Sequence, residues 1–263
     1  MPPRLHTDRE YEGELRKIRE MLLMMGAKVE EMLGQAMKAL VERDSDLAEK
    51  TLYIDRQINR LEIEVDDLCL RVLARRQPVA SDLRFITMAL KVVTDLERMG
   101  DLGVNICERV QELNEEPPLT PYVDVVAMAE AAQEMLREAL DAFVAADAER
   151  ATQIVERDSK VDAYYASIFR ELLTYMMENP RNIFRATRVQ SIAKYIERIA
   201  DHATNVAEMV VFMVRGKDIR HVGKLERRAT SQRAPTVVAA PPADDSDASL
   251  RDLARAPASR RTT

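Results

Sequence analysis

Two stretches of the chain carry the same oxygen-bearing side chains at the same spacing. In residues 95–110, DLERMGDLGVNICERV, these side chains are Glu97, Asp101, Asn105 and Glu108. In residues 195–210, YIERIADHATNVAEMV, they are Glu197, Asp201, Asn205 and Glu208. We call these sets the first stripe and the second stripe. Carboxylate and amide oxygens one helical turn apart can share a cation, and they suit magnesium, manganese or iron.

Each stripe lies on one face if its segment is helical. At ~100° per residue, the other members of the first stripe fall within about 80° of Glu97. Apolar residues such as Met99, Ile106 and Val110 cluster on the opposite side, and the second segment repeats this division. We therefore expect each helix to bury its apolar face and to direct a stripe of oxygen atoms outward.

Two interpretations of the stripes remain open. Like charges four residues apart destabilise an isolated helix by about 0.2–0.5 kcal/mol, and a bound cation would offset this cost. Alternatively, Arg98 and Arg198 neutralise the carboxylates from the side, and the stripes are ordinary solvated faces. An isolated stripe would favour the solvated face, whereas its recurrence among differing neighbours strengthens the case for a cation.

Two further polar pairs, each spaced by four residues, occur on the segment before each stripe. These pairs are Asp55 with Asn59 and Asp158 with Asp162. They could complete a cation site, but we favour an exposed surface for both.

A di-iron enzyme is disfavoured, because its usual Glu-x-x-His pattern is missing: Gly100 and Ala200 stand where His would be. His202 has no counterpart in the first stretch, where position 102 is Leu, and we expect it to be structural or exposed.

A basic stretch joins the second and third expected helices. Arg71, Arg75 and Arg76 precede Pro78 there. They could bind an acidic partner or an anion, or they could stabilise the end of a helix through its dipole. Both interpretations remain open.

Helical periodicity between prolines predicts an all-α protein. We expect helices at about 8–43, 47–76, 80–114, 121–146, 149–178 and 182–215. The stripes recur after 100 residues and the polar pairs after 103, which indicates a duplicated three-helix unit. The predicted organisation is one three-helix bundle in residues 1–116, a second in 117–216, and a disordered tail in 217–263, which is rich in Ala, Pro, Ser and Arg.

Composition narrows the function classes. Residues 217–263 hold ten basic and six acidic side chains, a net charge of +4. Since the whole chain carries −6, residues 1–216 carry −10. An acidic body argues against nucleic-acid binding. We find no signal peptide, no apolar run long enough for a membrane span and no phosphate-binding glycine loop, so we expect a cytoplasmic protein without direct membrane insertion.

Residues 76–108, RQPVASDLRFITMALKVVTDLERMGDLGVNICE, closely resemble the signature region of the PhoU family, and residues 181–208 resemble its second repeat. The resemblance covers about residues 8–216. It implies two tandem three-helix bundles and a homodimer. It also implies E/D-x-x-x-D motifs at Glu97–Asp101 and Glu197–Asp201, which hold iron or zinc in some members of the family and no metal in others. Position 102 is Leu where many relatives have His.

The resemblance also implies a function. Such a protein is not an enzyme. It represses the phosphate-starvation (Pho regulon) response by connecting the ATPase subunit of a phosphate importer with a membrane sensor histidine kinase. These partners could recruit it to the inner face of the membrane. Two alternatives remain. One is a metal-storing or metal-dependent hydrolytic protein, and the other is an accessory protein of a secondary phosphate transporter.

Overall fold

Six long helices and one short 3-10 helix make up residues 9–119 and 122–216, the part of the chain that the computed structural model describes. They are α1 (Arg9–Glu42), α2 (Ser45–Arg76), α3 (Ala80–Asn114), α4 (Val123–Ala145), α5 (Ala148–Glu178), η1 (Pro180–Asn182) and α6 (Ile183–Arg215). The all-α prediction is confirmed, and each long helix begins and ends within two residues of its expected bounds. The tail predicted for residues 217–263 lies outside the described residues.

The turns that open α2 and α5 share one geometry. Arg43 and Ala146 adopt left-handed conformations with φ of 56° and 52°. The residues that follow, Asp44 and Asp147, have φ/ψ of −98°/94° and −97°/95°. Asp44 accepts one hydrogen bond, and Asp147 two, from backbone N–H groups in the first turn of the helix, which stabilises each helix start. Two matching turns 103 residues apart support a duplicated unit.

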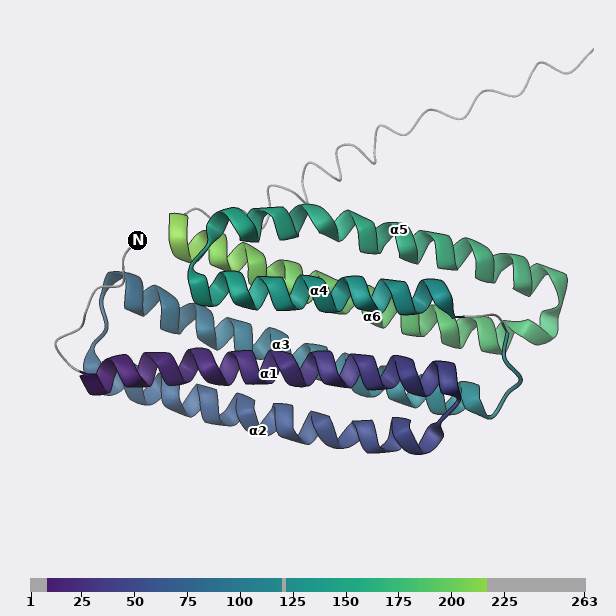
Figure 1. Cartoon of the computed structure of the whole chain (residues 1–263), viewed down its shortest axis with the longest axis horizontal. Coiled ribbons are helices and arrows are strands. Elements are labelled where there is room, and N and C mark those ends of the chain that lie inside the picture. The colour runs from purple at the N-terminus through teal and green to yellow at the C-terminus, as the bar shows by residue number, and fades with distance from the viewer. Residues whose placement is uncertain (1–8, 120–121, 217–263) are drawn as a thin grey trace, which may run out of the picture. The chain divides into compact units, whose positions relative to one another are not determined.

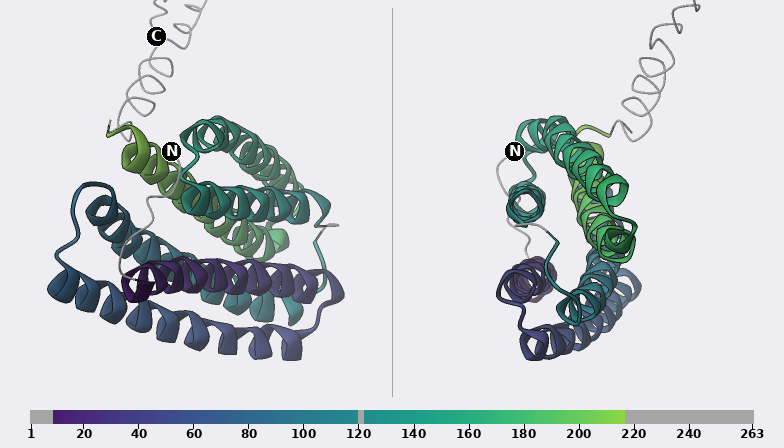
Figure 2. Two further views of the ribbon diagram at one scale, coloured as in Figure 1. Left: turned by 60° about the vertical axis from the view of Figure 1, so that its left-hand side comes forward. Right: turned by 90° about the vertical axis from the view of Figure 1, so that its right-hand side faces the viewer.

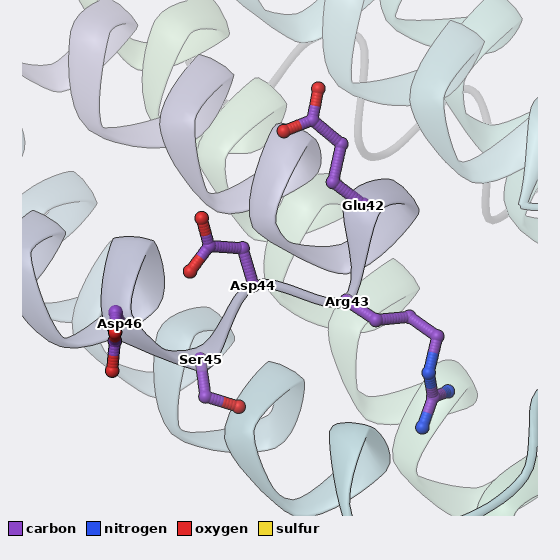
Figure 3. Close-up of a pocket in the computed structure, with 5 residues that line it drawn as sticks. All are labelled: Glu42, Arg43, Asp44, Ser45 and Asp46. Atoms are coloured by element: carbon purple, nitrogen blue, oxygen red, sulfur yellow. The ribbon is translucent and has the colours of Figure 1, made fainter.

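The first of these turns carries a shallow hollow, which Figure 3 shows. Five consecutive residues, 42–46, line it, so it is the surface of one turn and no cleft between helices. Arg43 extends away from the carboxylates of Glu42 and Asp44 (Figure 3) and donates hydrogen bonds to the carbonyl oxygens of Asn114 and Glu116. The hollow thus belongs to the connection between α1, α2 and the end of α3.

The helices form two layers (Figures 1 and 2). Helices α5, α6, α3 and α2 pack side by side in that order, and α4 and α1 cover one side of this curved layer. The two three-helix units, α1–α3 and α4–α6, meet where α3 packs on α6 and α1 on α4. Their buried side chains form one continuous hydrophobic core. Helices α2 and α5 therefore lie at the two outer edges, and each packs beside the helix that carries a stripe.

Residue size decides how closely α1 and α4 approach. A Cβ atom on Gly26 of α1 would lie 2.0 Å from Cδ1 of Leu140, a buried residue of α4. A larger residue at this crossing would force the end of the Leu140 side chain to move. Nearby, Gln133 of α4 donates a hydrogen bond to the carbonyl oxygen of Glu30, and Arg137 forms an ion pair with the Glu30 carboxylate.

Within residues 9–119 and 122–216, no helix combines the length and the apolar character that crossing a bilayer requires.

Candidate functional site

The first stripe faces outward on α3, as predicted. Asp101 and Glu108 are exposed, while Glu97 and Asn105 are partly buried. The opposite face of α3 is fully buried and includes Leu96, Met99, Ile106 and Val110. The periodicity of 3.6 residues therefore placed this stripe correctly.

The second stripe follows the prediction at three of its four positions. Asp201 is exposed, and Glu197 and Asn205 are partly buried. Glu208 is only 8% exposed, so the prediction that it faces solvent is wrong. All six residues of 206–211 are buried, which means that neighbouring helices cover this end of α6 on every side. A helical wheel cannot show such coverage, because it describes one helix alone.

Helix α2 lines one side of the first stripe. Its residues Asp55, Asn59 and Glu62 follow one another at intervals of four and three positions, so they share a face. This face lies beside the stripe, since Asp55 Oδ1 would be only 3.3 Å from a Cβ atom on Gly100 of α3. Burial is the main cause of the raised pKa of Asp55 and of Glu62, and the Asp101 carboxylate raises both further. We name Asp55, Asn59 and Glu62 of α2, together with Glu97 and Asp101 of α3, the first seam. Sequence analysis did not identify Glu62, although its spacing from Asp55 and Asn59 was a usable signal.

Two oxygen atoms of the first seam are buried without a hydrogen-bond partner, Oδ1 of Asp55 and Oδ1 of Asn59. The two residues are bonded to each other through their remaining polar atoms, with Asn59 Nδ2 donating to Asp55 Oδ2 at 2.9 Å. Our expectation that this pair is exposed surface is therefore wrong: both residues are partly buried. Buried oxygen atoms without a partner are costly, and a cation would satisfy them.

The carboxylates of the first seam repel one another. Burial raises the pKa of Glu97, and the Asp101 and Glu62 carboxylates raise it further, against the opposing effect of Arg98. Burial is also the main cause of the raised pKa of Asp55. A cation would relieve the repulsion that Asp101 and Glu62 exert on Glu97.

Gly100 makes room for the first seam. A Cβ atom at this position would lie 3.3 Å from Asp55 Oδ1 and 3.2 Å from Ile58 Cδ1. The glycine therefore lets this part of α2 pack closely on α3, beside Asp101. Because these contacts are tighter than ordinary van der Waals packing, a larger residue would push the Asp55 carboxylate away.

The corresponding side chains of α5 and α6 form what we name the second seam: Asp158, Asp162 and Tyr165 of α5 with Glu197 and Asp201 of α6. Asp158 is 6% exposed, so the expectation of surface is wrong for it, whereas Asp162 is exposed as expected. Thr204 Oγ1 of α6 donates a hydrogen bond to Asp158 Oδ1 at 3.4 Å. This contact draws Asp158 into the packed junction between α5 and α6.

Lys194 occupies the other end of the second seam. Its ammonium group forms an ion pair with Glu197 and lies 5.4 Å from the centre of the Tyr165 ring. Sequence analysis missed Lys194 and Tyr165, because it compared only the acidic positions of the two repeats.

The first seam fits a hard cation by the chemistry of its donors. Carboxylate and amide oxygens from two helices, two of them lacking a partner, are typical ligands of magnesium or manganese. In the described part of the chain, no three His, Cys, Asp or Glu side chains are grouped closely enough to hold one ion as they stand. Binding therefore requires the carboxylates to change rotamer toward one another, which their mutual repulsion opposes unless a cation is present.

The three arginines before Pro78 differ in their surroundings. Arg76 forms ion pairs with Glu10 and Glu14 of α1, at 2.9 and 3.1 Å, so it links α2 to α1. Arg71 and Arg75 are exposed on the last turns of α2. Of the three, these two are the more accessible to a partner.

Comparison with known proteins agrees with the duplicated architecture. The sequence profile described as the PhoU domain matches twice, at residues 22–110 and 125–210. The first match lies within α1–α3 and the second within α4–α6. The chain belongs to the PhoU family. Its two halves are thus two PhoU domains, and each contains one of the two stripes.

Relatives in the PhoU family align over most of the chain. The "phosphate-specific transport system accessory protein PhoU homolog" of Pseudomonas putida is 43% identical over 235 residues, which span 89% of this chain and 91% of the relative. The PhoU accessory protein of Escherichia coli K12 is 37% identical over 218 residues, or 83% of this chain and 90% of the relative. These names describe accessory proteins of transport, and PhoU proteins are regulatory proteins rather than enzymes.

Two solved PhoU structures share the fold. The crystal structure of PhoU from Pseudomonas aeruginosa has a TM-score of 0.75 and 44% identity, and the match covers 79% of this chain and all of that one, 100%. The "phosphate transport system regulatory protein PhoU" from Streptococcus pneumoniae has a TM-score of 0.73 and 30% identity, with 80% and 99% covered. The predicted arrangement of two three-helix PhoU units is thereby confirmed, and a role in regulating phosphate transport follows from the family.

Proposed function

We propose that this chain is a cytoplasmic adaptor that represses the phosphate-starvation (Pho regulon) response when phosphate is plentiful. It would act by contact, connecting the ATPase subunit of an ATP-driven phosphate importer with a membrane sensor histidine kinase. The observation that carries the proposal is the alignment of both PhoU domains, over most of their length, with proteins named as accessories of a phosphate-specific transport system.

The helical scaffold supports a role in binding partners. Its long outer helix α2 ends in two exposed arginines, Arg71 and Arg75, which are available to an acidic surface. We assign partner binding to this end of α2. Arginine suits such contacts because its planar guanidinium group binds carboxylates through two parallel hydrogen bonds. The homodimer implied by the family resemblance belongs to the same proposal, and light scattering of the purified chain tests it.

A divalent cation is the second component of the proposal. Asp55 and Asn59 of α2, with Glu97 and Asp101 of α3, would hold it. A bound cation would neutralise the repelling carboxylates and connect the two helices, so its role here is structural or regulatory. The donor atoms favour manganese or magnesium, while the family resemblance adds iron and zinc as candidates.

Deletion of the gene tests the regulatory proposal. We expect alkaline phosphatase expression to rise in high phosphate and to return to its repressed level when the wild-type chain is supplied. Unchanged expression in the deletion strain would reject the proposal. The deletion is then repeated in two strains, one with only the ATP-driven importer and one with only a secondary phosphate transporter. Loss of repression in the second strain alone would show that the chain serves the secondary transporter instead.

A matched pair of variants tests the surface. The Arg71→Glu/Arg75→Glu variant should fail to restore repression and should no longer bind the importer ATPase subunit in co-purification. The control Lys50→Glu/Arg60→Glu makes the same charge change at two other exposed positions of α2 and should restore repression. Equal behaviour of the two variants would remove this end of α2 from the proposed interface.

A further inference from the structure

The two seams are not chemically equivalent, although the acidic stripes on α3 and α6 repeat the same four residues. We propose that only the first seam takes up a divalent cation, and that in the second seam the chain's own Lys194 ammonium and Thr204 hydroxyl occupy the cation's place. This inference rests on the cation component of the proposed function. It is independent of the regulatory component, because it concerns metal binding by the purified chain.

The first difference is an internal cation at Glu197. Lys194 stands three residues before Glu197 and forms an ion pair with it. The corresponding residue before Glu97 is Thr94, whose hydroxyl donates to the carbonyl oxygen of Leu90 in its own helix. Within the described residues, Glu97 forms an ion pair only with Arg98, whose Nε lies 3.8 Å from Glu97 Oε2 on a side chain that is 63% exposed. Such an exposed pair contributes little.

The second difference concerns the buried aspartate of each seam. Asp158 accepts a hydrogen bond from Thr204, so its Oδ1 atom has a partner. The equivalent of Thr204 is Val104, which has no hydroxyl group, and the equivalent atom Asp55 Oδ1 is buried without a partner. The oxygen atom that would gain most from a cation is therefore in the first seam.

The third difference is the residue that faces the stripe from the outer helix. Glu62 of α2 corresponds to Tyr165 of α5, so an oxygen ligand is replaced by an aromatic ring. The Lys194 ammonium lies over this ring, an arrangement that stabilises the lysine rather than a metal ion. Gly100, which leaves room beside Asp55, corresponds to Ala200, so the second seam carries a Cβ atom at the position where the first has none.

One difference points the other way. Asp162 stands where the first seam has Asn59, so the second seam has an additional carboxylate on α5. Asp162 is exposed, however, and water screens its charge, whereas the Asn59 Oδ1 atom is buried. A divalent ion entering the second seam would meet the positive charge of Lys194 beside Glu197 and would have to displace it.

Manganese titration of the full chain tests this directly. After removal of bound metal with a chelator, Mn²⁺ binding is followed by isothermal calorimetry and by the electron paramagnetic resonance signal of free Mn²⁺. Asp101→Asn should weaken binding by about tenfold or more, since even outer partners of a metal change its affinity by about 10–100-fold. Asp201→Asn, the same change at the matching exposed position, should leave the isotherm unchanged. Equal losses in the two variants, or no binding by the wild-type chain, would overturn the inference.

Exchange of the distinguishing residues gives a second test. Thr94→Lys, at an exposed position of α3, should place an ammonium group beside Glu97 and abolish Mn²⁺ binding. Lys194→Thr combined with Tyr165→Glu should add a second bound Mn²⁺ per chain, with circular dichroism as the check on folding. If the double variant does not fold, Thr94→Lys decides alone, and unchanged binding in that variant contradicts the inference. Normal Mn²⁺ behaviour in a chain that fails to restore repression would reject only the regulatory proposal.

Discussion

His202 of α6 and Asp95 of α3 contact each other across the junction of the two PhoU domains, with Nδ1 and Oδ1 2.8 Å apart. The two side chains are only 19% and 16% exposed, so solvent screens the contact weakly. The pseudo-symmetric positions hold Leu102 and Tyr195, and the contact therefore has no equivalent in the opposite direction. His202 is thus a structural residue that holds α6 against α3, one of the two roles that sequence analysis expected for it.

We predict that loss of this contact weakens the junction of the domains. Asp95→Leu and His202→Leu should each lower the free energy of unfolding by about 1–3 kcal/mol, because each leaves a partly buried polar group without its partner. In a double-mutant cycle by chemical denaturation, the second substitution should cost less once the first is made. Additive effects would show that the two side chains do not stabilise each other, and the exposed Asp67→Asn serves as a control for loss of negative charge.

Two glycines of α1 should respond in opposite ways to alanine. Gly26→Ala places a Cβ against Leu140 of α4 and should cost about 1–3 kcal/mol, the usual penalty for overpacking. Gly13→Ala meets no atom within 4 Å and should stabilise the chain by about 0.5–1 kcal/mol, because alanine loses less conformational entropy in a helix. Melting temperatures of the two variants against wild type provide the measurement. A stable Gly26→Ala chain would mean that α4 moves away at little cost.

The first seam should make the metal-free chain less stable as the pH rises. The folded state raises the pKa of Glu97 above its ordinary value of 4.5, so the folded chain binds more protons than the unfolded chain between these two values. The free energy of unfolding then falls as the pH increases through this window and stays lower above it. Glu97→Gln should reduce this fall in urea denaturation with a chelator present, whereas Glu49→Gln at an exposed position should not. Parallel curves for wild type and Glu97→Gln would contradict the prediction.

Cys69 and Cys107 should be unreactive in the native chain. Both side chains are fully buried, and burial raises the pKa of each thiol to about 12. Because the thiolate is the reactive form, a disulfide reagent at about pH 8 should modify neither residue until the chain unfolds. The exposed variant Ser81→Cys provides a positive control. Rapid modification of the wild-type chain would indicate that α2 and α3 separate readily in solution.

Much of the fold follows from local sequence. Prolines mark the breaks before α3, α4 and α6, and the 3.6-residue periodicity identifies the segments between breaks as helices, because each helix has one apolar face. The breaks before α2 and α5 contain no proline, and Asp44 and Asp147 start these helices instead. The matching turns at Asp44 and Asp147 lie 103 residues apart, the same offset at which the polar pairs of the sequence recur. The outward position of Asp101 and Asp201 could be read from a single helical wheel.

Contacts between helices had to come from the tertiary structure. The burial of Glu208 and Asp158, the two oxygen atoms left without partners at Asp55 and Asn59, and the position of Lys194 over Tyr165 all depend on which helix lies beside α3 or α6. A repeat in sequence shows that two segments share a backbone and a pattern of charge. Lys194 and Glu197 are neighbours on one helix, but the contact between Asp158 and Thr204 joins residues 46 positions apart, and only the packing of α5 on α6 brings these two together.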